Sequence, residues 1–187
     1  MSYGEKFEKA LICASRLHKD QVRKGTNTPY ITHLLAVASI VGENGGTEDE
    51  VVAALLHDAP EDQGGEATLE DIRVRFGDNV ATIVEGCTDT YEHPKPPWRE
   101  RKGRYLAHLA SVPGSVRLVA SADKLHNARA VLSDYRVLGE DLWERFNGEK
   151  EGTLWYYRAI VDTLPDGRPV VEELDRVVSD LERLARG

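Results

Sequence analysis

A histidine and three carboxylates lie close together in the chain: His57, Asp58, Glu61 and Asp62. They follow an apolar stretch, residues 51–56, that is typical of a buried helix. Taking a carboxylate out of water is costly unless a partner compensates its charge, and a metal ion is a common partner. On a helix, His57 and Glu61 would lie one turn apart, as would Asp58 and Asp62. The run indicates a divalent metal site with a polarised water beside it, and the alternative is a helix end with solvated acids.

Two more polar residues, His33 and Asp123, occur within other apolar stretches that are typical of helices. An unpaired imidazole or carboxylate would be unfavourable there. With His57 and Asp58 they make a set of two imidazoles and two carboxylates that contains no thiolate. Such mixed nitrogen and oxygen ligands suit Mn, Fe or Zn better than Ca. We expect these four side chains to be the metal ligands.

The order of these residues, H…HD…D, resembles the HD phosphohydrolase superfamily. Three longer motifs narrow the resemblance: Arg-Lys ahead of Pro-Tyr-Ile-x-His, then His-Asp-x-x-Glu-Asp, then Ala-Asp-Lys-Leu-x-Asn. Together they resemble the hydrolase domain of RelA/SpoT-type alarmone enzymes over about residues 5–163. No synthetase or regulatory region follows in this sequence, so the likeness is closest to the stand-alone small alarmone hydrolases. The resemblance implies one divalent ion per chain, with Mn²⁺ as the expected metal.

The resemblance also implies roles for residues around the metal. Glu61 and Asp62 would be the acidic pair that positions or deprotonates the attacking water. Arg23 and Lys24 would hold the purine, because a guanidinium can stack on a base and an ammonium can meet a phosphate. The segment 25–28 makes this loop one residue longer than in many relatives.

Two other residues are candidates for substrate contact. Asn127 follows Asp123 by one helical turn, which would place its amide beside the ligand carboxylate. The resemblance implies that this amide contacts the sugar of a nucleotide, and a surface Asn is the alternative. Tyr30 is expected either to flank the purine pocket or to pack under the loop. Of the remaining histidines, His126 is expected beside the ligands or on the surface, and ordinary surface or packing positions are expected for the others, His18, His93 and His108.

The elements that would hold these residues are helical almost throughout. Apolar residues recur at three- and four-residue steps. Pro29 is expected to open the second helix, Thr47 to cap the third, and Thr68–Asp71 to form a capping box on the fourth. Pro60 should end or kink the third helix near Asp58, because proline lacks an N–H and clashes with the preceding turn. The expected helices span about residues 4–19, 30–43, 48–58, 68–76, 80–87, 98–111, 114–136, 150–163 and 168–185.

Without alternating strand patterns or repeats, the chain is predicted to be an all-α, single-domain HD-type helical bundle over residues 1–187. The helix at 168–185 should complete the bundle. Apolar content of 41% and charged content of 30% are ordinary for a soluble protein. Cys13 and Cys87 have no CxxC spacing, so buried thiols are expected. With no signal peptide and no long apolar run, we expect a cytoplasmic protein that does not enter a membrane.

The net charge of −8 argues against nucleic-acid binding, which requires a basic face. It allows a small phosphate-bearing substrate, because a metal and a few local cations can supply the attraction. One segment, residues 95–104, is rich in Lys and Arg. It is either a solvated helix face or a basic strip beside the metal cleft. The sequence does not indicate an oligomeric state.

The resemblance predicts a metal-dependent hydrolase that removes the 3′-pyrophosphate from alarmone nucleotides such as (p)ppGpp. One alternative is an HD phosphohydrolase acting on other purine nucleotides, such as (p)ppApp or the 2′-phosphate of NADPH. A second alternative is a non-catalytic nucleotide-sensing module. A degenerate sensor would be expected to lose a metal ligand or an acid, and this sequence retains all of them. The expectation is therefore an enzyme.

Overall fold

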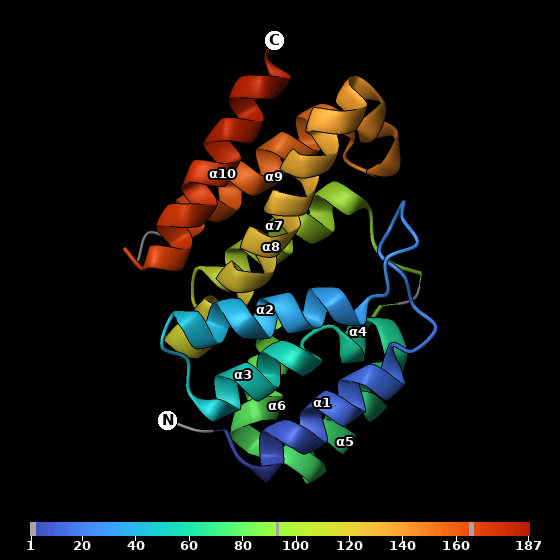
Figure 1. Ribbon diagram of the computed structural model, residues 1–187, viewed down its shortest axis with the longest axis vertical. Coiled ribbons are helices and arrows are strands. Elements are labelled where there is room, and N and C mark those ends of the chain that lie inside the picture. The colour runs from blue at the N-terminus through green and yellow to red at the C-terminus, as the bar shows by residue number, and fades with distance from the viewer. Residues whose placement is uncertain (1–2, 93, 165–166) are drawn as a thin grey trace.

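The computed structural model describes residues 3–92, 94–164 and 167–187, and within these ranges the chain is a bundle of helices (Figure 1). An isolated antiparallel bridge joins Val22 and Pro29, and the described ranges contain no β-strand. The all-α prediction is confirmed. The elements are α1 (Glu5–Leu17), α2 (Ile31–Glu43), α3 (Glu48–Leu56), α4 (Ala59–Gln63), α5 (Gly65–Phe76), α6 (Asp78–Cys87), α7 (Trp98–Leu109), α8 (Gly114–Leu138), the 3₁₀ helix η1 (Gly139–Arg145), α9 (Glu149–Thr163) and α10 (Pro169–Ala185).

The start and end of α3 follow from local sequence signals. Thr47 caps the helix as predicted, and it forms a capping box with Glu50, whose carboxylate accepts a hydrogen bond of 2.7 Å from the Thr47 backbone N–H. At the other end α3 stops at Leu56, and a separate short helix, α4, begins at Ala59. Pro60 sits in the first turn of α4, where its missing N–H costs nothing. The chain therefore breaks at His57 and Asp58, close to the predicted position.

Two predicted helix starts are wrong. Helix α5 begins at Gly65, so no capping box forms at Thr68–Asp71; the Thr68 hydroxyl instead donates to the Gln63 carbonyl at 2.9 Å. The break before α5 uses Gly64 and Gly65, whose positive φ angles of 133° and 65° are accessible to glycine. Helix α2 begins at Ile31 and not at Pro29, because Pro29 pairs with Val22 across the preceding loop. The 3₁₀ helix η1 was not predicted.

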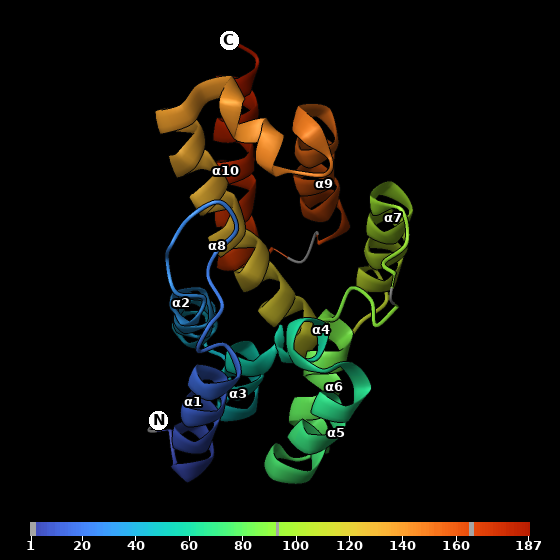
Figure 2. The ribbon, with the colours of Figure 1, turned by 90° about the vertical axis from the view of Figure 1, so that its right-hand side faces the viewer.

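The longest helix, α8, forms the centre of the bundle and packs against α2, α3, α6, α10 and η1. Val119 and Ala120 in the first half of α8 are fully buried, as are Leu55 and Leu56 at the end of α3. Burying these apolar side chains brings the end of α3 against the first half of α8. Figure 2 shows α7 at the side of the bundle, where it packs against α9. This arrangement places the α3–α4 junction, α2 and α8 around one point.

The outer helices complete the bundle. Helix α10 packs on α8 and α9 as expected. Arg158 of α9 forms ion pairs with Asp175 at 2.6 Å and Glu182 at 2.8 Å, both of which belong to α10. Cys13 is buried and Cys87 is partly buried, both as free thiols. His93 lies outside the described residues.

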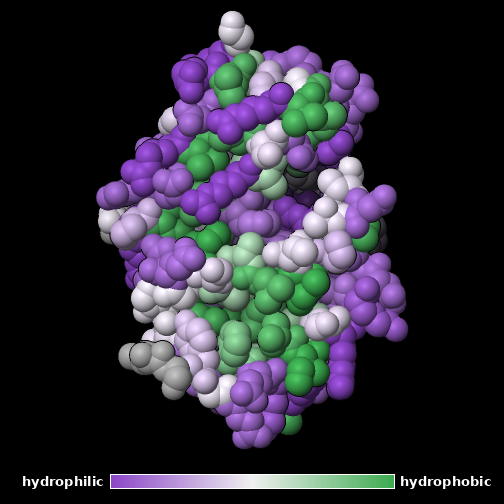
Figure 3. Space-filling view, in the orientation of Figure 1, coloured by the Kyte–Doolittle hydropathy of each residue, from purple (hydrophilic) through white to green (hydrophobic). Residues whose placement is uncertain are grey.

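The helices near the site have two different faces. Helix α2 buries His33 and exposes Leu35, which is 44% accessible. Figure 3 shows apolar side chains on the outer surface over the region of α1 and α2 in Figure 1. No described helix is both long and apolar enough to cross a membrane. The buried His33 on the inward face of α2 is the polar residue of this helix that requires a functional explanation.

Candidate metal centre and substrate cavity

The four predicted metal ligands meet at one point in the structure. His33 comes from α2, His57 and Asp58 from the α3–α4 junction, and Asp123 from α8. The His33 Nε2 atom lies 3.4 Å from Asp58 Oδ2 and 3.2 Å from Asp123 Oδ1. The His57 Nε2 atom lies 3.1 Å from Asp58 Oδ2 and 3.7 Å from Asp123 Oδ1. Ligand atoms of His33, His57 and Asp58 all lie within 4.8 Å of one another, a grouping suited to a metal ion.

Both imidazoles are oriented by hydrogen bonds at their other nitrogen. His57 Nδ1 donates to the Ala54 carbonyl at 2.8 Å, which leaves a lone pair on Nε2. His33 Nδ1 pairs with His126 Nδ1 at 2.8 Å. Burial and the neighbouring His33 lower the pKa of His126 to about 4, so its ring is neutral and can accept this hydrogen bond. A hydrogen bond at the second ring nitrogen is the usual way in which proteins orient a ligating imidazole.

The geometry fits a bound cation. The Nε2 atoms of His33 and His57 are buried and have no hydrogen-bond partner. Two donor atoms that each lie about 2.1 Å from one ion are about 3.0–3.4 Å apart at octahedral or tetrahedral angles. The separations of 3.1–3.7 Å between the imidazole nitrogens and the carboxylate oxygens are close to these values. The unpartnered nitrogens and the nearby carboxylates would thus be satisfied together by one ion.

The charges at this point favour a cation as well. Burial raises the pKa of Asp58 and Asp123, but His57 and His33 beside them, and Lys124 beside Asp123, hold both pKa values well below the usual range. Burial lowers the pKa of His57, but the neighbouring carboxylates of Asp58 and Asp123 raise it well above its ordinary value. Both carboxylates are therefore ionised. A proton on His57 and a bound metal are alternative ways to compensate the same negative charges.

Further side chains hold the two carboxylates in place. Tyr30 donates its hydroxyl to Asp58 Oδ2 at 2.6 Å, and Lys124 contacts Asp123 Oδ2 at 2.5 Å. Asn127 donates its amide to Asp123 Oδ1 at 2.5 Å, so the amide lies beside the carboxylate as the one-turn spacing predicted. Tyr30 thus has a role that the sequence did not reveal, because its hydroxyl reaches a candidate ligand.

A cavity of about 200 Å³ is lined by the predicted ligands Asp58 and Asp123 and also by Glu61 and Asp62. The hydrogen bonds of Glu61 and Asp62 are made with residues outside the ligand set. Glu61 Oε1 pairs with Lys95 at 2.8 Å, and Glu61 Oε2 accepts from the Asp89 backbone N–H at 3.3 Å. Asp62 Oδ2 accepts from the Gln21 amide at 2.8 Å. Desolvation raises the pKa of Asp62, the Gln21 hydrogen bond opposes this change, and the nearby carboxylates add to it.

Part of the basic segment 95–104 contributes to the wall of this cavity, which is one of the two alternatives that the sequence left open. Lys102 reaches the cavity from α7 and contacts Asp89 Oδ2 at 2.6 Å, while Arg101 contacts the same oxygen. Burial and the neighbouring Lys124 lower the pKa of Lys102. The basic segment 95–104 is therefore divided: Lys95 and Lys102 face the acidic residues of the site, whereas Arg104 is exposed. The run of charged residues in the sequence does not show which of them face the site and which face the solvent.

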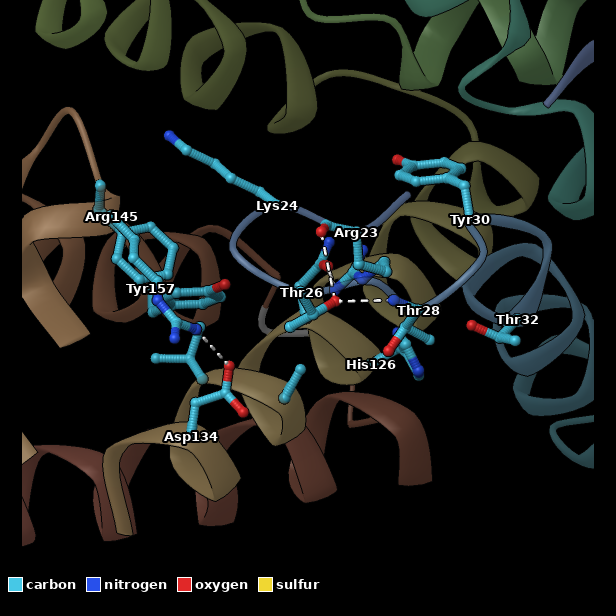
Figure 4. Close-up of a pocket in the computed structure, with 14 residues that line it drawn as sticks. Arg23, Lys24, Thr26, Thr28, Tyr30, Thr32, His126, Asp134, Arg145 and Tyr157 are labelled. Carbon is cyan, nitrogen blue, oxygen red and sulfur yellow. Dashed lines mark hydrogen bonds and ion pairs between the residues drawn. The ribbon is translucent and has the colours of Figure 1, made fainter. Parts of the chain in front are cut away.

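A second pocket has a volume of about 450 Å³ and shares part of its wall with the first. Figure 4 shows the side chains that line this second pocket. Arg23, Tyr30 and Asn127 line both pockets, and Arg23 donates to the Asn127 side chain at 2.7 Å. The Arg23 guanidinium lies 5.9 Å from the centre of the Tyr30 ring. The structure thus brings together the residues predicted to bind substrate. The wall of the second pocket also includes the exposed Lys24, the aromatic residues Phe146 and Tyr157, and the ion-paired residues Asp134 and Arg145.

This fold and site define an HD domain. The chain belongs to the HD domain family, because residues 10–153 match its family model. A Xenopus tropicalis protein named guanosine-3′,5′-bis(diphosphate) 3′-pyrophosphohydrolase MESH1 is 44% identical over 119 residues, which are 62% of this chain and 64% of the frog protein. A GTP pyrophosphokinase of Streptomyces antibioticus is 39% identical over 127 residues, 67% of this chain and 15% of that much longer protein. The chain thus spans less than two thirds of these relatives.

Solved structures extend the likeness to almost the whole chain. One is described as a metazoan ortholog of SpoT that hydrolyses ppGpp and plays a role in starvation responses. It superposes with a TM-score of 0.80 at 26% identity, covering 97% of this chain and 98% of that chain. A Listeria monocytogenes EGD-e protein superposes with a TM-score of 0.71 at 32% identity, covering 81% of this chain and 99% of that chain. The predicted HD-type fold is confirmed.

Proposed function

We propose that this chain is a metal-dependent hydrolase that removes the 3′-pyrophosphate from alarmone nucleotides such as (p)ppGpp. The observation that carries the proposal is the pair of buried, unpartnered imidazole nitrogens that face two ionised carboxylates beside a second pocket. Relatives named as pyrophosphohydrolases supply the substrate class. We further propose that residues 1–187 act as one cytoplasmic domain on a purine nucleotide, without binding nucleic acid.

The proposed metal ligands are His33, His57, Asp58 and Asp123, with Mn²⁺ as the proposed ion and one ion per chain. Nitrogen and oxygen ligands suit this metal. When bound, the ion would supply Lewis acidity, which polarises a phosphoryl oxygen and lowers the pKa of water. Tyr30, Lys124 and Asn127 would keep the two carboxylates in position through the contacts described above.

Glu61 and Asp62 would position the attacking water and accept its proton. In the proposed reaction a bond forms between the water oxygen and phosphorus, and the bond between that phosphorus and the ribose 3′-oxygen breaks. The 3′-oxygen takes up a proton to become a hydroxyl, and pyrophosphate leaves. Lys102 and Lys124 line the same cavity, so their charges would offset the negative charge of the phosphates. The purine would occupy the second pocket beside Arg23 and Lys24.

Replacing Arg23 with alanine should raise KM by about 5–30-fold with little change in kcat, because a stacked guanidinium contributes about 1–2 kcal/mol to ground state and transition state alike. Steady-state kinetics on the best substrate measures both constants. The matched control is Arg183→Ala, which removes an exposed arginine from α10. A collapse of kcat at unchanged KM would show that Arg23 acts in the chemical step instead.

Saturating metal should stabilise the protein. A ligand present at 100 times its Kd adds about 2.7 kcal/mol, which corresponds to about 5–10 °C in Tm for a chain of this size. Thermal melts of chelator-treated protein with and without Mn²⁺ measure the shift, and Ca²⁺ should produce a smaller one. An equal shift with Ca²⁺, or none with Mn²⁺, would contradict the proposed transition-metal site.

One assay tests the proposed function directly. Purified protein with Mn²⁺ is incubated with ppGpp, ppApp, NADPH and simple nucleotides, and the products are identified. Release of pyrophosphate from ppGpp with formation of GDP supports the proposal. Preference for ppApp or for the 2′-phosphate of NADPH would indicate a different purine nucleotide phosphohydrolase. Tight nucleotide binding without turnover would indicate a sensing module.

A further inference from the structure

One buried histidine lies outside the metal centre and has no part in the reaction as proposed. His18 follows the last residue of α1 and is 2% accessible. Its ring stacks on Tyr30 with centroids 5.2 Å apart and planes 19° apart. Its Nδ1 atom lies 2.7 Å from Gln21 Oε1. The sequence suggested an ordinary packing or surface position, but this hydrogen bond connects His18 with the acidic pair.

The connection runs through the side-chain amide of Gln21. Its Oε1 faces both His18 Nδ1 and the Gln63 amide nitrogen, each at 2.7 Å. Its Nε2 donates to Asp62 Oδ2 at 2.8 Å. The backbone holds Gln21 in register as well, because the Tyr30 N–H donates to the Gln21 carbonyl at 2.9 Å. Both the oxygen and the nitrogen of the Gln21 side-chain amide therefore form hydrogen bonds.

The hydrogen-bond directions in this network are determined by chemistry. An ionised carboxylate can only accept, so the Gln21 end that faces Asp62 must be the NH₂ group. The Gln21 oxygen must then face His18 and Gln63, and His18 must carry a hydrogen on Nδ1. Rotation of the Gln21 amide by 180° would set its oxygen against the Asp62 carboxylate and its NH₂ group against the Gln63 NH₂ group. The His18 N–H therefore helps to hold the amide in the orientation that supports Asp62.

We propose that His18 and Gln21 are positioning residues for Asp62: the His18 N–H orients the Gln21 amide, which holds Asp62 Oδ2 while Asp62 lines the cavity. This inference rests on the proposed function, in which Asp62 positions or deprotonates water. Neither His18 nor Gln21 would touch the substrate. Hydrogen-bond partners of metal ligands change activity by about 10–100-fold when they are removed, and we expect an effect at the lower end of that range for the partners of a catalytic acid.

Two substitutions separate the hydrogen bond from the packing. His18→Phe keeps a flat ring against Tyr30 and removes the N–H. His18→Asn removes the ring, but its amide nitrogen lies near the place of Nδ1 and can donate to Gln21. If His18 acts only through packing, the Phe variant should be both more stable and more active than the Asn variant. If His18 positions Asp62, the order of activity should be the reverse of the order of stability.

The experiment measures Tm, KM and kcat of full-length wild type and both variants, with His108→Phe as a histidine control. We expect kcat to fall about 10-fold in His18→Phe at unchanged KM, and to recover to within about 3-fold in the less stable His18→Asn. The double variant His18→Phe/Asp62→Asn should be no slower than Asp62→Asn alone. Activity that follows Tm across the variants, or additive losses in the double variant, would overturn the proposal.

If wild type hydrolyses none of the nucleotides, the proposed function fails, and the positioning network is read by NMR instead. The Gln21 side-chain NH₂ resonances are assigned by their loss in Gln21→Leu. They should shift in His18→Phe and in Asp62→Asn, and return close to the wild-type position in His18→Asn. Gln21 resonances that do not respond to His18→Phe would overturn the inference independently of any activity.

Discussion

Replacing Asp58 with alanine should abolish both metal retention and turnover. Asp58 Oδ2 lies within 3.4 Å of the Nε2 atoms of both His33 and His57, whereas Asp123 Oδ1 is closer to His33 and farther from His57, so Asp58 is the carboxylate that lies near both unpartnered nitrogens. The Tyr30 hydroxyl that holds this oxygen would also lose its partner. No neighbouring acid occupies the same place, because Glu61 and Asp62 are held by Lys95 and Gln21.

Elemental analysis and kinetics of the Asp58→Ala protein test this expectation. The matched control is Asp180→Ala, which removes an exposed carboxylate on α10 that pairs with Arg183. The control should retain metal and activity. Circular dichroism verifies that the Asp58→Ala protein remains helical. Full metal occupancy with wild-type activity would remove Asp58 from the ligand set and would leave the site without its central carboxylate.

Replacing Glu61 with glutamine should leave metal content and KM near wild type and lower kcat by about 10²–10⁴-fold. Glutamine preserves the size of the side chain but removes the basic oxygen that would accept a proton from water. It also removes the ion pair with Lys95, which lies 2.8 Å from Glu61 in the structure.

Asp62→Asn measured in parallel separates the roles of the two acids. The two side chains have different surroundings, because Glu61 is paired with a lysine and Asp62 accepts from a neutral amide. The larger loss of kcat identifies the residue that accepts the proton. Lys95→Ala serves as a control for the loss of the ion pair alone. Near-normal kcat in both acidic variants, with metal bound, would mean that neither carboxylate activates the water.

Much of the architecture could be predicted because it depends on local periodicity. The helices that hold the four proposed ligands follow from apolar residues at three- and four-residue steps and from breakers such as Pro60. The spacing of Asp123 and Asn127 within one helix was enough to place an amide beside a carboxylate, since helix geometry fixes that relation. The errors at Thr68 and Pro29 occurred where a neighbouring segment supplied a competing interaction, which is the Gln63 carbonyl at the end of α4 for Thr68 and the bridge to Val22 for Pro29.

The surroundings of the proposed ligands could not be predicted in the same way. The all-α class, the candidate ligands and the candidate acids could be predicted, because each depends on residue type and short spacing. The contact between His126 and His33, the entry of Lys102 into the cavity and the link from His18 to Asp62 through Gln21 became visible only in the folded chain. These contacts join segments whose relative positions depend on how whole helices pack. Periodicity predicts which face of a helix is buried, but the packing of the other helices determines which side chains that face meets.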